Sequence, residues 1–186
     1  MRLTGGLERG RRLRAPRGAG TRPTGAKVRE AMFNILGPAP ADPVLDLFAG
    51  TGALGIEALS RGAPSAVFVE RDARAVSALQ SNLRDLGITS LARVVQRKVD
   101  TALAQLAREG VRFGWVFVDP PYASGAVLPV LEALAGGDLL ASGAVIIVEH
   151  DKRHVPPDSV GDVRLADRRY YGDTGVSFYR HETGLT

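Results

Sequence analysis

Hydrophobic positions along the chain fall into short runs, separated by longer segments in which they recur every three or four residues. The short runs predict buried strands at 44–48, 66–70, 93–96, 115–119 and 144–149. The periodic segments predict helices from the glycine turn through Leu59, from the cap residue Asp72 to Gly87, over 101–108 and near 126–135. Because strands and helices alternate, we expect a mainly parallel sheet with helices on both faces.

Both ends of the chain depart from this alternation. Residues 164–166 and 176–179 predict two strands with no room for a helix between them, so that an antiparallel hairpin completes a seven-stranded sheet. Near the N-terminus, a helix is predicted over 25–36, and the glycines and leucines before it allow a short ribbon, although their pattern is weak. We therefore expect a Rossmann-like α/β domain over 27–186, preceded by an arm over 1–26.

The charge of the chain is concentrated in this arm. The formal net charge is +4, but residues 1–29 hold nine basic residues and one acidic residue, whereas the rest hold 15 basic and 19 acidic residues. Most of the basic residues in the arm are arginines, whose guanidinium groups suit bidentate contact with phosphate. We interpret the arm as a nucleic-acid-binding segment, with a solubilising tail as the alternative. The candidate RNA contacts are Arg9, Arg11, Arg12, Arg14 and Arg22.

The composition also excludes several kinds of site. Cysteine is absent, which rules out disulfides, thiolate metal sites and a cysteine nucleophile. His150, His154 and His181 lack the spacing of metal ligands, so we expect no metal. No signal peptide is recognisable, and the apolar runs are too short to cross a bilayer. We expect a cytoplasmic protein without a membrane partner.

A glycine-rich turn follows the first predicted strand. Gly50-Thr51-Gly52-Ala53-Leu54-Gly55 has the G-x-G-x-x-G pattern and opens a helix, which is typical of nucleotide cofactor sites. Asp46 can hold the ammonium group of S-adenosylmethionine, a group that dinucleotides lack. Glu70 ends the second strand, where an acid can accept hydrogen bonds from ribose hydroxyls, and Asp100 follows the third, near an expected adenine amine. Asp46, Gly50, Thr51, Gly52, Glu70 and Asp100 are thus candidate ligands of S-adenosylmethionine, with NAD or FAD as the alternative.

A second candidate site, Asp119-Pro120-Pro121-Tyr122, leaves the fourth strand. Prolines fix the backbone and donate no hydrogen bond, so the Pro120 carbonyl and Asp119 can accept the two N–H groups of an exocyclic amine. Tyr122 offers an aromatic face on which an extruded base can stack. This arrangement favours methylation of a base amine by alignment. The alternative is a proline-rich turn whose tyrosine covers the core, and Glu149 is interpreted as an ordinary strand-end acid.

With both sites present, the sequence resembles the RsmD-type bacterial 16S ribosomal RNA guanine-N2 methyltransferases over nearly its whole length. The resemblance is carried by 22–24, 28–30, 33–34, 46–55, 57–63, 68–70, Asn82, 119–122 and 148–149. Residues 22–34 are the part most particular to this family, because many amino-methyltransferases share the two site motifs.

The resemblance implies a class I methyltransferase that acts as a monomer on 16S ribosomal RNA of the small subunit. It assigns S-adenosylmethionine to Asp46, Gly50, Gly52 and Glu70, and the guanine N2 amine to residues 119–122. Asp100 matches less well, because Arg97-Lys98-Val99 precedes it where a small residue is more usual. Adenine-N6 methylation of DNA or another RNA, a non-catalytic RNA-binding assembly factor and a nicotinamide enzyme remain as alternatives.

Overall fold

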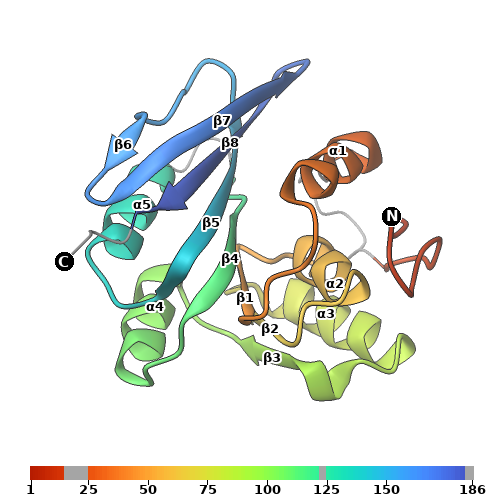
Figure 1. The fold of residues 1–186 in the computed structure, drawn as a ribbon. Helices are drawn as coiled ribbons and strands as arrows, with labels where there is room; N and C mark the ends of the chain where they lie inside the picture. The colour runs from red at the N-terminus through yellow and green to blue at the C-terminus, as the bar shows by residue number, and fades with distance from the viewer. Residues whose placement is uncertain (15–24, 122–124, 183–186) are drawn as a thin grey trace.

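The computed structural model describes residues 1–14, 25–121 and 125–182 (Figure 1). In these ranges one eight-stranded sheet has the order β3-β2-β1-β4-β5-β8-β7-β6. The strands are β1 Val44–Leu47, β2 Ala66–Val69, β3 Ala92–Val95, β4 Phe113–Val118, β5 Leu140–Asp151, β6 Ser159–Val160, β7 Val163–Tyr171 and β8 Thr174–His181. Strands β3, β2, β1, β4 and β5 are parallel, and β8, β7 and β6 complete the sheet in antiparallel pairs.

Helices cover both faces of this sheet. They are α1 Ala26–Leu36, α2 Ala53–Ser60, α3 Ala73–Asp85, α4 Val99–Arg108 and α5 Val127–Ala135, with a 3-10 turn η1 at Thr89–Leu91. Helices α1, α2 and α3 lie on one side, and α4 and α5 on the other (Figure 1). Because side chains alternate along a strand, Leu45 and Leu47 enter the core beneath α4 and α5, while Val44 enters the opposite core. Asp46 therefore faces α2.

The predicted fold class is confirmed, with two differences in detail. The structure adds β6, whose two residues are too few to produce a periodic signal. Strand β7 is longer than the predicted 164–166. Its full length gave no signal because only its first residue is buried and its apolar and polar residues do not alternate beyond Leu165. Helix α3 begins as predicted, with the Asp72 side chain accepting a hydrogen bond from Ala75 N at 2.8 Å.

The first 14 residues form a hairpin, which we call the N-terminal ribbon (residues 1–14). Leu3 N donates to Arg11 O at 3.0 Å, and Leu13 N donates to Met1 O at 2.8 Å. The ribbon is docked on the domain, because Leu3 and Leu13 are each only 2% exposed and pack in the core that contains α1 and α2. The boundary predicted between arm and domain stays a prediction.

A buried carboxylate fastens the ribbon. Glu57 of α2 accepts hydrogen bonds from Thr4 N at 2.8 Å and Thr4 Oγ1 at 2.7 Å. It also pairs with Arg61 Nε at 3.0 Å and with Arg29 Nε of α1 at 3.4 Å. The Arg29 side chain is fully buried and donates to Arg2 O of the ribbon as well. Two cations thus offset the burial of one anion, and together these groups join the ribbon to α1 and α2.

Candidate active site

The register of the parallel strands brings the two predicted motifs to one edge of the sheet. Leu47, the last residue of β1, pairs with Val69 of β2 and with Val118 of β4, and Val118 pairs with Val148 of β5. The residues that follow these strand positions are Phe48, Glu70, Asp119 and Glu149. The glycine turn and the Asp-Pro-Pro segment therefore leave neighbouring strands side by side, at the carboxyl edge where open α/β sheets bind ligands.

The glycine turn (residues 48–52) has an unusual backbone. Phe48, Gly50 and Gly52 all have positive φ angles, of 59°, 55° and 81°. Phe48 is the one non-glycine residue with this conformation within the described ranges. A left-handed conformation costs a residue with a Cβ about 1–2 kcal/mol, and such strain is concentrated at functional sites. Ala49 N donates to Val69 O of β2 at 3.0 Å, which ties the turn to the sheet.

Two glycines let the start of α2 approach α3 and the sheet closely. A Cβ on Gly52 would collide with Leu79 of α3, and a Cβ on Gly55 would collide with the ring of Phe68 in β2. Since α2 begins at Ala53, its first backbone N–H groups lie directly after the turn. These groups and the helix dipole favour a ligand that carries acceptor atoms.

Asp46 lies under the turn, as its place on β1 predicted. Its side chain is 2% exposed, and Oδ2 accepts a hydrogen bond from Gly55 N at 2.8 Å. Burial raises the pKa of Asp46 to about 8, against the lowering effect of the Gly55 hydrogen bond, and the charge of Glu70 raises it further. A buried carboxyl group with a raised pKa is suited to a cationic partner, because a nearby positive charge stabilises its ionised form.

Glu70 is held firmly at the end of β2. Oε2 accepts from Gly50 N at 2.9 Å, and Oε1 accepts from Arg71 N and Asp72 N, each at 2.8 Å. A carboxylate has about four lone-pair positions, so these three backbone donors leave about one for a ligand hydroxyl. The carboxylate is therefore orientated beside the glycine turn before any ligand binds.

The acceptor motif emerges from a fully buried strand. All six residues of β4 are buried, and Phe117 and Trp115 pack against Phe33 of α1 at ring-centre distances of 5.6 and 6.0 Å. Directly after β4, Asp119 is half-buried, Pro120 is buried and Pro121 is exposed. Tyr122 lies outside the described residues, so its predicted stacking role stays a prediction.

Asp100 is placed less favourably for its predicted role. It lies in the first turn of α4 with an exposed side chain. The carboxylate accepts hydrogen bonds from Thr101 N at 2.6 Å and from Thr101 Oγ1 at 3.1 Å, and these lower its pKa. It therefore stabilises the start of the helix, and contact with adenine stays a prediction.

The arginines predicted to bind RNA lie on the outer face of the N-terminal ribbon. Arg9, Arg11, Arg12 and Arg14 are exposed, whereas Arg22 lies outside the described residues. Two of them also hold the ribbon to the end of α3, where Arg11 Nη2 donates to Asp85 O at 2.8 Å and Arg14 Nε pairs with the Asp85 carboxylate at 2.9 Å.

Sequence reasoning gave Asn82 no role, yet it contacts the glycine turn. The Asn82 side chain donates to Thr51 O at 3.1 Å. Its position in the sequence could have identified it. Asn82 lies three residues after Leu79 and four before Leu86, on the apolar face of α3, where a buried polar side chain needs a hydrogen-bond partner.

Two expected absences can be examined in the described ranges. No group of three or more His, Asp or Glu side chains there is arranged to hold a metal ion. No helix in the same residues is long and apolar enough to span a bilayer.

Comparison with known proteins places these features in a family. Residues 1–180 match the family model described as "Conserved hypothetical protein 95". The chain is 40% identical to the "Putative rRNA methyltransferase YlbH" of Bacillus subtilis over 97% of this chain and 98% of that protein. It is 38% identical to the "Ribosomal RNA small subunit methyltransferase D" of Escherichia coli, over 98% of this chain and 90% of the relative. The solved structure "Putative methyltransferase yhhF from Escherichia coli" is 37% identical, with a TM-score of 0.83 and 99% of each chain covered.

Proposed function

The chain belongs to the family of the RsmD-type ribosomal RNA methyltransferases, and we propose that it transfers a methyl group from S-adenosylmethionine to the N2 amine of a guanine in 16S ribosomal RNA. The observation that carries this proposal is the side-by-side placement of the glycine turn and the Asp-Pro-Pro segment, at the ends of the paired strands β1 and β4. One strand end suits the methyl donor, and its neighbour suits the amine acceptor.

The residues of the glycine turn fit S-adenosylmethionine. Asp46 would hold the ammonium group, and Glu70 would accept a hydrogen bond from a ribose hydroxyl at its remaining acceptor position. Gly50 and Gly52 would let the backbone approach the ligand closely. When bound, this cofactor supplies a methyl group on a sulfonium, which an amine can attack directly. Thr51 and Asp100 are proposed as further contacts of S-adenosylmethionine. The ammonium group of this cofactor accounts for the buried Asp46, whereas a dinucleotide has no such group.

Asp119 and the Pro120 carbonyl would hold the acceptor amine. The lone pair of a guanine N2 amine is delocalised into the ring, so the nitrogen is a poor nucleophile. Two acceptors that hold its two N–H groups draw the nitrogen toward tetrahedral geometry and aim its lone pair at the methyl group. The residues contribute mainly alignment and electrostatic stabilisation, and Pro121 and Tyr122 would shape the pocket for the base.

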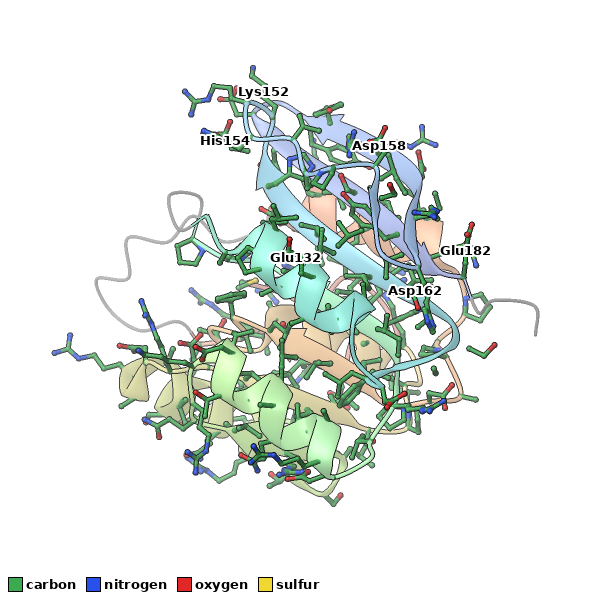
Figure 2. All side chains as sticks on the ribbon, turned by 90° about the vertical axis from the view of Figure 1, so that its left-hand side faces the viewer. Glu132, Lys152, His154, Asp158, Asp162 and Glu182 are labelled. Atoms are coloured by element: carbon green, nitrogen blue, oxygen red, sulfur yellow. The ribbon has the colours of Figure 1, made fainter. Side chains whose placement is uncertain are left out.

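The distribution of charge supports an RNA substrate. The N-terminal ribbon lies on the side of α2 and α3 (Figure 1), and its Arg9, Arg11, Arg12 and Arg14 are exposed. The side of α5 and the outer strands instead carries both signs of charge, with Glu132, Lys152 and Asp158 among its exposed residues (Figure 2). We propose Arg9, Arg11, Arg12, Arg14 and Arg22 as phosphate contacts. The protein would then act in the cytoplasm, as a monomer, on the small ribosomal subunit.

Incubation with labelled S-adenosylmethionine and small subunits from a bacterial strain that lacks its own enzyme of this family tests the proposal. We expect label in N2-methylguanosine after nucleoside analysis. Asp119→Ala should lower the rate about 100-fold or more, because an electrostatic contact made at the transition state is lost, while S-adenosylhomocysteine still binds. Label in N6-methyladenosine would support the adenine alternative, and no label in any nucleoside would refute methyl transfer to this substrate.

A further inference from the structure

Asn82 is a buried polar residue whose hydrogen bonds reach two distant parts of the chain. It is 1% exposed on α3, where an unpaired amide would be costly. Its Oδ1 accepts from Arg14 N at 2.8 Å, and its Nδ2 donates to Arg14 O and to Thr51 O, each at 3.1 Å. An amide nitrogen has two N–H groups, so one serves the N-terminal ribbon and the other serves the glycine turn.

The contact with Thr51 fixes a peptide unit of the glycine turn. The Thr51 carbonyl lies in the same rigid plane as the Gly52 N–H, which donates to Ala49 O at 2.7 Å. This plane is therefore held at one end by the turn itself and at the other by Asn82. If the Asn82 contact is lost, the plane is free to rotate, and the positions of the adjacent N–H groups change.

On the ribbon side, Asn82 engages both backbone groups of one residue. Arg14 directs its N–H and its carbonyl to Asn82, while its exposed side chain pairs with Asp85. The backbone contacts are short-range and directional, so they require the end of the ribbon to stay in place over α3. A single side chain thus links the position of the ribbon to the geometry of the turn.

We propose that Asn82 is a positioning residue that couples RNA binding at the N-terminal ribbon to cofactor binding at the glycine turn. The inference rests on the proposed function, which assigns those two ligands. RNA phosphates that contact the ribbon arginines bind the docked ribbon more tightly than an undocked one, and the docked ribbon keeps Asn82 on Thr51. Because such coupling is reciprocal, the cofactor product and the small subunit should raise each other's affinity, by about fivefold or more.

Binding measurements on the full chain test this coupling. Calorimetry gives the Kd of S-adenosylhomocysteine, and filter binding gives the affinity for small subunits with and without saturating S-adenosylhomocysteine. Asn82→Asp keeps the acceptor for Arg14 N but has no N–H for Thr51, so S-adenosylhomocysteine should bind about fivefold more weakly and the coupling should disappear. Asn82→Ala should behave in the same way. Gln80→Ala, at an exposed position of the same helix, is the matched control and should keep the coupling.

A second pair of variants acts from the exposed side and leaves the core intact. Arg14→Ala and Arg14→Pro both remove the side chain, but only proline also removes the N–H that Asn82 accepts. S-adenosylhomocysteine should bind several-fold more weakly to Arg14→Pro than to Arg14→Ala, with similar melting temperatures. A purely structural role for Asn82 would change the melting temperature without removing the coupling.

The outcomes separate this inference from the proposed function. If the wild-type protein binds both ligands without coupling, or if Asn82→Asp and Arg14→Pro keep wild-type coupling, the inference is overturned while the function stands. If the wild-type protein binds neither ligand, the proposed function is overturned, and the inference with it.

Discussion

The substitution Asp46→Asn tests the electrostatics of the glycine turn most directly. The amide has nearly the same shape and keeps an oxygen for the Gly55 N–H, but it cannot ionise. The pKa of Asp46 is raised from 3.8 to about 8 by burial. At about 1.4 kcal/mol per pKa unit, the free energy of unfolding of Asp46→Asn should exceed that of the wild type by about 4 kcal/mol at pH 7. This is an upper limit, because local relaxation relieves part of the cost of burying an ionised carboxylate.

The raised pKa of Asp46 also predicts how the free energy of unfolding changes with pH. Between about pH 4 and the raised pKa of about 8, folded protein keeps a proton on Asp46 that the unfolded chain has released. The free energy of unfolding of the wild type should therefore fall as pH rises, relative to Asp46→Asn, by up to about 1.4 kcal/mol per pH unit. Above the raised pKa the difference should level off. Urea denaturation of both proteins across this range measures it, and a constant difference would refute the assigned pKa.

Binding of the cofactor product should lower the raised pKa of Asp46 again. The ammonium group of S-adenosylhomocysteine stabilises the ionised carboxylate, so binding at pH 7 should release a proton from Asp46 of the wild type. Calorimetry in two buffers with different ionisation enthalpies counts the released protons. Asp46→Asn should release none and bind more weakly. Equal proton release by the two proteins would show that the ammonium group does not meet Asp46.

Two further substitutions test the packing around this turn and the attachment of the ribbon. Gly52→Ala should destabilise the fold by about 2 kcal/mol or more, because the φ of Gly52 is 81° and a Cβ would collide with Leu79. The variant should also show no calorimetric binding of S-adenosylhomocysteine. Binding as tight as that of the wild type would contradict the proposed role of the turn. Glu57→Gln should cost about 3–5 kcal/mol in urea denaturation and speed tryptic cleavage of the ribbon, because buried Arg29 loses its counter-charge. The substitution Glu30→Gln, at an exposed position of α1, is its control. Equal cleavage rates of the two variants would contradict the role of Glu57 in fastening the ribbon.

The strand-end residues could be predicted from the sequence because two local rules suffice. Hydrophobic runs locate the strands, and parallel pairing brings their carboxyl ends to one edge. Asp46, Glu70 and Asp119 therefore lie where the alternation of elements predicted. The two residues of β6 and the full length of β7 could not be predicted, because neither produces an alternating pattern.

The contacts that join the ribbon to the domain could not be predicted for a different reason. Glu57 meets Thr4 across 53 residues of chain, and Asn82 meets Arg14 across 68. No sequence periodicity links positions so far apart. Taken alone, Glu57 and Asn82 are simply polar residues among the apolar residues of a helix. The charge of the first 29 residues suggested an arm, but charge does not reveal whether an arm is docked.

The way the ribbon is docked bears on what it does. Leu3 and Leu13 alone would bury apolar surface, and such contacts tolerate sliding. The buried ion pairs of Glu57 and the three hydrogen bonds of Asn82 instead require one position, since a shifted ribbon would leave charged or polar groups unpaired in the interior. A solubilising tail gains nothing from a fixed position. A fixed position does benefit a surface that must present arginines to phosphates at a set distance from the glycine turn. The docking of the ribbon therefore favours the RNA-binding interpretation over the solubilising tail.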